Sequence, residues 1–339
     1  MLTLNQCAQV LPTLLKHNIV PYLKGSPALG KSAVVHTLAA QYQLKVIDLR
    51  LAQCDPVDLA GFPVFDQQTK KASYFPLDTL PTEGTEIPAG YKGWIIFLDE
   101  FSSASLAVQA SAYKLVLDRM VGQHKLHPKA LLVAAGNREE DNAIVVPMSS
   151  ALVSRFAIFD VELAHPEWIE WASGHGIDSR ISAFLQFRPS NLYTFKPATA
   201  DKPYASPRTW EMVSKVIKGN PNVTAKTHQA IFQSLLGEAV AVEFLQFLKL
   251  QDNIPSVAEI AASPESVAVS EDIATCWAVM GMLVEHINAQ NFKPLSKYLD
   301  RISAELRVVA MREIRQRHPD LKALPEYNAW IVKTASEVM

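Results

Sequence analysis

The sequence predicts an α/β fold in which a parallel sheet with flanking helices is followed by an all-helical region. A glycine-rich loop joins an apolar run at residues 19–23 to an alanine- and valine-rich helical stretch at residues 33–43. Two later apolar runs, residues 94–98 and 131–135, have the length and composition of buried parallel strands. From His165 onward the strand-like runs stop and helical patterns take over.

The loop has the spacing Gly-x-x-x-x-Gly-Lys-Ser, and its eight residues are Gly25, Ser26, Pro27, Ala28, Leu29, Gly30, Lys31 and Ser32. Glycines let a backbone wrap an anion, and the N-terminus of the following helix favours negative charge. Lys31 can then reach the β- and γ-phosphates, and the Ser32 hydroxyl can hold Mg²⁺. The loop therefore predicts a site for ATP and Mg²⁺, and a glycine turn that merely precedes a helix is the alternative.

Polar residues follow the two later strand candidates directly. Asp99 and Glu100 end the first, where Asp99 can orient the Mg²⁺ shell and Glu100 can polarise a water for attack on the γ-phosphate. Asn137 ends the second, and its amide is placed to touch the attacking water or the γ-phosphate. A solvated acidic turn and a turn asparagine are the plainer explanations. The phosphate loop upstream favours the catalytic interpretation.

This ordered series of motifs resembles the AAA+ ATPases. In that family the loop is the Walker A motif, residues 95–100 form Walker B, and Asn137 is the sensor 1 residue. Residues 151–156 (Ala-Leu-Val-Ser-Arg-Phe) are similar to the arginine-finger segment. Residues 205–210 (Ala-Ser-Pro-Arg-Thr-Trp) resemble the sensor 2 motif, which starts a lid helix. The matched features span residues 20–216.

The resemblance implies a P-loop NTPase fold of the AAA+ class, a parallel sheet with flanking helices followed by an all-α lid and a C-terminal helical region. It implies an AAA+ nucleotide-binding α/β domain at residues 1–164. The helical lid and C-terminal helical region would then occupy residues 165–339. In that second part, we predict helices at residues 167–187, 208–217, 225–251, 270–289 and 295–317.

The resemblance also implies roles for two arginines. Phosphoryl transfer places charge on the equatorial oxygens of the moving group, so cations held there accelerate the reaction. Arg208 would supply a cation from the lid of the same chain. Arg155, which precedes a strand candidate at residues 156–163, would serve the nucleotide of a neighbouring subunit. Taken alone, each is better explained by an ion pair, and Arg119 and Arg138 are rival trans-acting arginines.

Two segments resemble the MoxR-like branch, residues 55–61 (Asp-Pro-Val-Asp-Leu-Ala-Gly) and residues 100–109. This resemblance implies an ATP-hydrolysing motor that acts as a chaperone-like remodeller of a partner protein and assembles as a homo-hexamer. The partner often carries a von Willebrand A-type domain. Within the long segment 63–91, residues 64–75 predict a hairpin with a polar turn at residues 67–70. The resemblance suggests that it faces the ring's axial pore, and an exposed decorative hairpin is the alternative.

The amino-acid composition argues against several classes of protein. The chain has 339 residues, 49% of them hydrophobic, which is enough for two cores. Its formal net charge of −2 argues against a protein built to coat nucleic acid. Cys7, Cys54 and Cys276 form no Cys-x-x-Cys pair, so we expect no disulfide framework or zinc site. With no signal-peptide pattern and no apolar run of bilayer length, we expect a cytoplasmic protein.

Two other function classes share the same loop. One is a DNA-directed AAA+ ATPase, such as a loader or a nuclease-associated translocase, against which the near-neutral charge counts only mildly. The other is a P-loop protein that binds nucleotide as a structural switch with little turnover. A simple switch needs few of the catalytic candidates Glu100, Asn137, Arg155 and Arg208.

Overall fold

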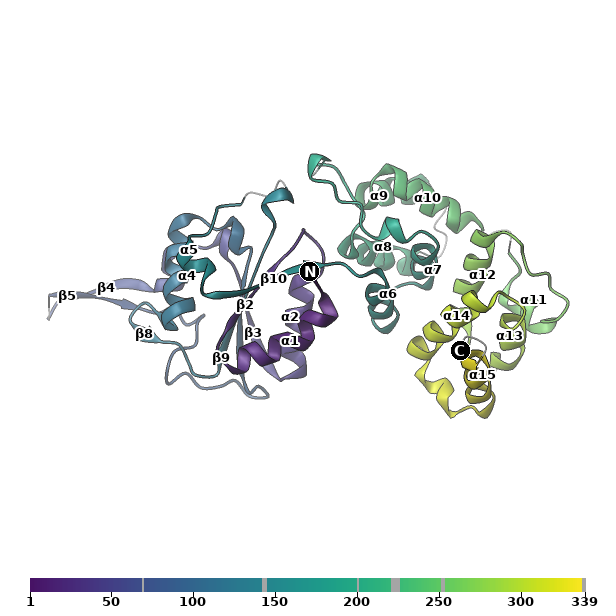
Figure 1. Cartoon of the computed structure of the whole chain (residues 1–339), viewed down its shortest axis with the longest axis horizontal. Coiled ribbons are helices and arrows are strands. Elements are labelled where there is room, and N and C mark those ends of the chain that lie inside the picture. The colour runs from purple at the N-terminus through teal and green to yellow at the C-terminus, as the bar shows by residue number, and fades with distance from the viewer. Residues whose placement is uncertain (69, 142–144, 200, 221–225, 251–253, 337–339) are drawn as a thin grey trace. The chain divides into compact units, whose positions relative to one another are not determined.

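The computed structural model describes residues 1–68, 70–141, 145–199, 201–220, 226–250 and 254–336. The chain divides into two compact units (Figure 1). The first unit comprises Met1–Ala164 and Lys196–Ala200, and the second comprises His165–Phe195 and Asp201–Met339.

The first unit contains a six-stranded sheet in the order β1-β10-β2-β9-β6-β3, and every neighbouring pair is parallel. The six strands are β1 (Leu2–Thr3), β2 (Val20–Lys24), β3 (Leu44–Arg50), β6 (Gly93–Asp99), β9 (Ala130–Gly136) and β10 (Phe156–Glu162). The strand that leads into the glycine-rich loop, β2, lies between β10 and β9. Because the strands are parallel, β2, β6 and β9 present their carboxyl ends at one edge of the sheet, where ligands of such sheets bind.

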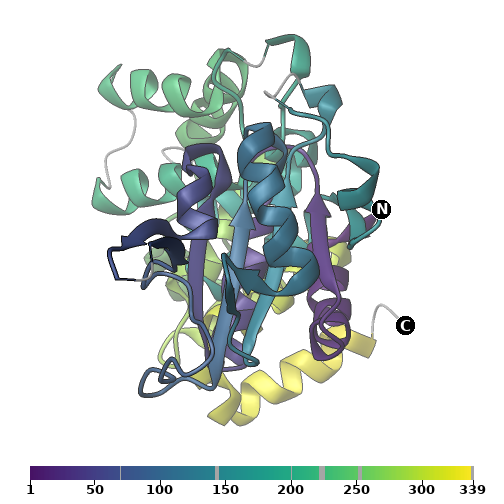
Figure 2. The same ribbon diagram turned by 90° about the vertical axis from the view of Figure 1, so that its left-hand side faces the viewer.

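Helices cover both faces of this sheet (Figures 1 and 2). The helices α1 (Leu4–Lys16) and α2 (Lys31–Gln41) pack on one face and α4 (Leu106–Asp118) packs on the other. Successive strand residues alternate between the two cores, so Ile95 belongs to the α1–α2 side and Ile96 to the α4 side. Our sequence prediction did not include α1, which begins with a capping box at Thr3.

Two small hairpins lie beside the sheet in the first unit. The predicted insertion hairpin is present as β4 (Phe62–Asp66) and β5 (Lys71–Phe75), although residue 69 of its predicted turn lies outside the described residues. A second hairpin, β7 (Met120–Val121) and β8 (His124–Lys125), supports its base, because His124 Nε2 lies 3.2 Å from the Tyr74 carbonyl oxygen. Gly122, at a positive φ, passes so close to the carbonyl of Ala60 that a side chain there would clash.

Short helical turns connect the main elements of the first unit, and they are η1 (Leu51–Gln53), α3 (Pro56–Ala60), η2 (Phe101–Ser103), η3 (Glu139–Asp141) and α5 (Ser150–Val153). Two of them lie at the carboxyl edge of the sheet, because η2 follows β6 and η3 follows β9. The side chains of these two turns can therefore take part in the candidate site.

All regular elements among the described residues of the second unit are helical, as the sequence predicts. Its α-helices are α6 (His165–Gly174), α7 (Ser179–Phe187), α8 (Pro207–Gly219), α9 (Lys226–Leu236), α10 (Glu238–Lys249), α11 (Val257–Ala262), α12 (Ile273–His286), α13 (Phe292–Leu299), α14 (Ala304–Arg317) and α15 (Pro325–Ser336). Together with the sheet of the first unit, these helices confirm the predicted architecture, a parallel sheet with flanking helices followed by a helical region. None of the described helices combines the length and the apolar character that crossing a bilayer requires.

Three of our long predicted helices are wrong, because each is two helices. The segment 167–187 breaks between α6 and α7, where Gly176 has a φ of 67° and Asp178 caps the next helix. The segment 225–251 breaks at Gly237, with a φ of 81°, and its residues 225 and 251 lie outside the described part. The segment 295–317 breaks before α14, which Ser303 caps. Glycines at positive φ interrupt helices and N-capping side chains begin new ones, and apolar periodicity reveals neither.

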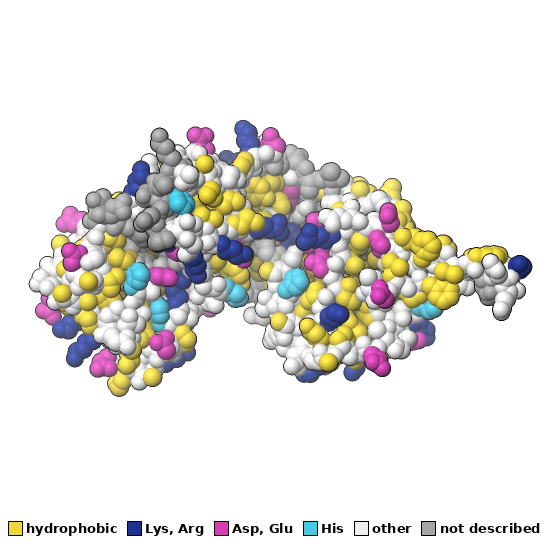
Figure 3. Space-filling model, turned by 180° about the vertical axis from the view of Figure 1, so that it is seen from behind, with side chains coloured by type: hydrophobic (Ala, Val, Ile, Leu, Met, Phe, Trp, Pro, Cys, Tyr) yellow, Lys and Arg dark blue, Asp and Glu magenta, His cyan; other side chains and the backbone are white. Residues whose placement is uncertain are grey.

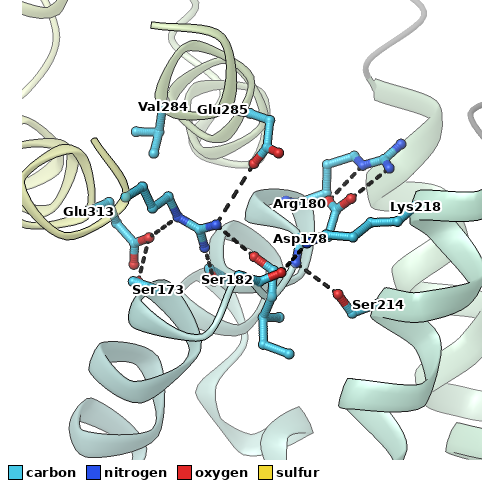
Figure 4. Close-up of polar contacts among 12 residues, drawn as sticks. Ser173, Asp178, Arg180, Ser182, Ser214, Lys218, Val284, Glu285 and Glu313 are labelled. Atoms are coloured by element: carbon cyan, nitrogen blue, oxygen red, sulfur yellow. Dashed lines mark hydrogen bonds and ion pairs between the residues drawn. The ribbon is translucent and has the colours of Figure 1, made fainter. Parts of the chain in front are cut away.

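A buried polar cluster joins early and late helices of the second unit (Figure 4). Arg317 on α14 donates to Glu313 Oε2 at 2.8 Å, to the Ile177 carbonyl at 2.6 Å and to Ser182 Oγ on α7 at 3.0 Å. Ser173 on α6 donates to the same Glu313 oxygen at 2.7 Å. A buried ion pair requires such extra hydrogen bonds, so the cluster ties α14 to α6 and α7.

Candidate active site

The glycine-rich loop follows β2 and has the backbone shape that anion binding requires. Gly30, with a φ of 102°, is the residue before α2, and Ala28 also lies in the left-handed region with a φ of 60°. The Gly25 amide donates to the Gly136 carbonyl at 3.2 Å, which holds the start of the loop against the end of β9. The loop therefore presents its backbone and the N-terminus of α2 at the carboxyl edge of the sheet.

Lys31 lies at the centre of this edge. Its side chain is buried, and its ammonium group donates to the carbonyls of Gly25 at 2.7 Å and Ser26 at 2.8 Å. It also reaches Asn137 Oδ1 at 3.3 Å, so the predicted sensor 1 residue and the loop lysine lie together. These three oxygens are neutral, so the buried ammonium group is well placed to meet an anion.

The Walker B candidates lie beside the loop. The Ser32 hydroxyl donates to Asp99 Oδ2 at 3.1 Å, so the two predicted Mg²⁺-binding side chains are in direct contact. Glu100 takes the left-handed conformation with a φ of 54°, which is uncommon for a non-glycine residue. Its amide donates to Asp99 Oδ1 at 2.9 Å. Within the described residues, the Glu100 carboxylate makes no hydrogen bond or ion pair.

Two hydroxyl groups that the sequence analysis missed lie beneath Asn137. Ser102, 3% exposed, accepts a hydrogen bond from the Asn137 amide at 2.9 Å and is also hydrogen-bonded to Tyr22, which is 1% exposed. Burial raises the pKa of Tyr22 to about 12, so its hydroxyl stays protonated. The available sequence signal is weak. Tyr22 is the only hydroxyl in its apolar run, and Ser102 lies two residues after Glu100.

A third missed residue contacts the loop itself. Asp141, a buried carboxylate in η3, accepts a hydrogen bond from the Ser26 hydroxyl at 3.0 Å. The two residues are 115 positions apart in the chain, so no local pattern could pair them. The contact ties the segment after β9 to the phosphate loop.

The three candidate trans-acting arginines have different surroundings. Arg155 precedes β10 at the amino edge of the sheet, its side chain is exposed, and it has no polar partner among the described residues. Arg119 also lies at this edge, but it donates to the Ala130 carbonyl, and burial lowers the pKa of its guanidinium group. Arg138, after β9, donates to the Val161 carbonyl at 3.0 Å.

Arg208 belongs to the second unit and occupies the first turn of α8. That helix begins with Pro207 and a capping box between Ser206 and Thr209, and Trp210 anchors it by donating to the Asn191 carbonyl at 2.9 Å. The Arg208 side chain is exposed and has no polar partner among the described residues. The predicted sensor 2 arginine therefore starts a well-anchored helix.

The structure thus brings together Lys31, Ser32, Asp99 and Asn137, with Glu100 adjacent. The Ser32 hydroxyl and the Asp99 carboxylate are hard oxygen ligands of the kind that Mg²⁺ accepts beside water and phosphate. Among the described residues there is no group of three or more His, Cys, Asp or Glu side chains that could hold a metal ion.

No family model matches the sequence, and no curated protein matches it. Among solved structures, the chain is similar to RuvB, a Holliday junction branch migration motor from Thermotoga maritima. The identity is 15%, with 88% of this chain and 86% of that one covered, and the TM-score is 0.35. It is also similar to NtrX from Brucella abortus in complex with ATP, at 13% identity, with 96% and 68% covered and a TM-score of 0.40. TM-scores of this size carry no argument, so the fold assignment rests on the strand order and on the geometry of the loop.

Proposed function

We propose that this protein is an ATP-hydrolysing AAA+ motor of the MoxR type that remodels a partner protein. The observation that carries the proposal is the convergence of Lys31, Ser32, Asp99 and Asn137 at the carboxyl edge of a parallel sheet, beside a left-handed Glu100. Each of these side chains has a task in phosphoryl transfer, and they come from three different strand ends. A protein that only binds nucleotide does not need this set.

The roles follow from the chemistry of each group. The amides of the loop and the Lys31 ammonium would bind the phosphates, and Ser32 and Asp99 would hold Mg²⁺, which would supply positive charge beside the phosphates. Glu100 acts as the base that polarises the attacking water, since its carboxylate has no polar partner among the described residues. Asn137 orients that water or the γ-phosphate.

The position of Arg155 is an argument for an assembly of several copies of this chain, which we propose is a homo-hexamer. Phe156 pairs with Val20 at the amino edge, and the loop begins five residues further along β2, which is about 16 Å along the sheet. Arg155 therefore lies too far from the loop of its own chain to touch the same nucleotide. An exposed arginine at this place suits a role at the nucleotide of a neighbouring subunit, with Arg208 acting from the lid of the same chain.

The insertion hairpin favours a protein partner over nucleic acid. Phe62 and Phe75 are paired on one face of the ribbon and are 59% and 53% exposed, and Phe65 is 59% exposed on the other face. Figure 3 shows apolar side chains gathered on this projecting ribbon. Exposed apolar surface on both faces is unusual for a hairpin that meets only water, and it is typical of a protein contact site. A partner with a von Willebrand A-type domain is the kind that the MoxR resemblance suggests.

The proposed function is tested by steady-state ATP hydrolysis measured across protein concentration, with and without nucleic acid. We expect Mg²⁺-dependent hydrolysis that rises more than linearly through the assembly range, because each site needs its neighbour. Single-stranded or duplex DNA should leave the rate almost unchanged. A large stimulation that weakens with salt would instead show a DNA-directed motor, since phosphate contacts release counterions.

A further inference from the structure

A chain of hydroxyl groups runs beneath the candidate site and touches all three strand ends that form it. Tyr22 belongs to β2, Ser102 to the turn after β6, and Asn137 follows β9. Ser102 accepts from the Asn137 amide at 2.9 Å and is hydrogen-bonded to the Tyr22 hydroxyl. The carbonyl of Ser102 also accepts from the Val146 amide at 2.7 Å. The backbone of Asn137 is therefore held by a side chain from the catalytic turn.

The fit around the two hydroxyl groups is close. A Cβ atom on Gly136 would lie 2.0 Å from the Tyr22 hydroxyl oxygen and 2.8 Å from Ser102 Oγ, so the residue before Asn137 must be glycine. The Tyr22 ring is confined as well. It packs against Phe101 at 6.1 Å and against Phe156 at 5.4 Å between ring centroids. Packing and burial leave Tyr22 and Ser102 little room to rearrange, so they fix the Asn137 backbone in one place.

We infer that Tyr22 and Ser102 form a hydroxyl pair that positions Asn137 for ATP hydrolysis, an inference that rests on the proposed function. Neither residue touches the nucleotide in this account. They act through the Asn137 backbone, whose side-chain oxygen contacts the Lys31 ammonium at 3.3 Å. Catalysis is sensitive to such positioning, because a displacement of about 1 Å costs up to about a hundredfold in rate.

The first test is Ser102→Ala, which removes the acceptor of the Asn137 amide without adding bulk. We expect kcat for ATP hydrolysis to fall about tenfold to a hundredfold while KM and the affinity for a fluorescent ATP analogue stay near wild type. Ser103→Ala is the matched control. Ser103 is the adjacent serine in the same turn, and its hydroxyl has no polar partner among the described residues. This control should keep the wild-type kcat.

The second test is Tyr22→Phe, which removes only a hydroxyl and keeps the aromatic packing. We expect a loss in kcat of about fivefold, as for one hydrogen bond, again with an unchanged KM. In the double variant Tyr22→Phe/Ser102→Ala, the loss should be no greater than in Ser102→Ala alone. Once the Ser102 hydroxyl is gone, the Tyr22 hydroxyl no longer acts on Asn137, so the two effects are not additive.

The outcomes separate this inference from the proposed function. If the wild type hydrolyses ATP but a folded Ser102→Ala keeps its kcat, or loses affinity instead, the positioning role is wrong and the ATPase stands. If Ser102→Ala does not fold, as judged by its melting temperature, Tyr22→Phe decides, and an unchanged kcat there overturns the inference. A wild type that binds ATP without turnover would remove both the proposed function and this inference.

Discussion

The two edges of the parallel sheet differ in how their functional candidates are held. At the carboxyl edge, Lys31 and Asn137 contact each other, as do Ser32 and Asp99. At the amino edge, Arg155 is exposed and has no polar partner among the described residues. A preorganised group of side chains is what a binding site requires, whereas an exposed arginine without a polar partner is free to contact another molecule. The comparison suggests that one chain carries the larger part of its own site and lends the last cation to another chain.

The largest effect should come from breaking the carboxyl edge itself. Lys31→Ala should abolish ATP binding, because it removes the buried cation that meets the β- and γ-phosphates. Nucleotide affinity is measured by fluorescence titration. Lys45→Ala, an exposed lysine on β3, is the control and should bind normally. Unchanged affinity in Lys31→Ala would show that the loop does not bind nucleotide as proposed.

The same edge also allows binding and turnover to be separated. Glu100→Gln should retain ATP but release no phosphate, because an amide fills the same space and cannot act as a base. The measurement combines nucleotide retention with phosphate release, and Glu140→Gln, an exposed glutamate in the turn after β9, serves as the control. Hydrolysis by Glu100→Gln at near the wild-type rate would exclude Glu100 as the base.

A change at the amino edge should impair hydrolysis and leave ATP binding intact, unlike the loss of Lys31. Arg155→Ala should bind ATP normally but hydrolyse it about a thousandfold more slowly, the loss typical of a missing arginine finger. Single-turnover hydrolysis with saturating ATP measures this loss independently of binding. If Arg155→Ala hydrolyses ATP at the normal rate, Arg138 or Arg208 must supply the cation. The proposed difference in function between the carboxyl and amino edges would then be wrong.

The smallest effect should come from the other arginine of the amino edge. Arg119 donates to the Ala130 carbonyl, so Arg119→Ala should lower the free energy of unfolding by about 1 kcal/mol and leave hydrolysis nearly unchanged. Denaturant titration and the steady-state rate measure the two quantities. A large loss of hydrolysis with unchanged stability would identify Arg119 as the trans-acting residue in place of Arg155.

The sequence alone predicts the parts of this site that a local pattern encodes. The phosphate loop requires glycines at fixed spacing, and buried parallel strands are continuous apolar runs, so Lys31, Asp99 and Asn137 could be placed at strand ends. The contacts of Tyr22 with Ser102, and of Ser26 with Asp141, join distant parts of the chain and leave no periodic trace. The sequence pattern also does not reveal the left-handed backbone conformation of Glu100, which sets the path of the chain after β6.

In the second unit, local sequence patterns likewise predict the helices but not where they break. Apolar periodicity predicts helix there correctly, but it continues across the break at Gly237, so one predicted helix is in fact α9 and α10. Similarly, the polar cluster around Arg317 and Glu313 could not be predicted, because the basic residues of that stretch look like a solvated helix face. In the structure, the side chains of Arg317 and Glu313 are 8% and 5% exposed.

The most direct test of a site shared between subunits is a mixture of two inactive variants, Arg155→Ala and Glu100→Gln, combined before assembly. Some interfaces in a mixed ring join an intact Glu100 to an intact Arg155, so partial ATP hydrolysis should return. A mixture of Glu100→Gln with Lys31→Ala is the control. Glu100 and Lys31 are both proposed to serve the nucleotide of their own chain. No subunit in that mixture carries both residues intact, so the mixture should stay inactive. Absence of hydrolysis at every ratio of Arg155→Ala to Glu100→Gln would show that Arg155 serves its own chain and would contradict the central claim.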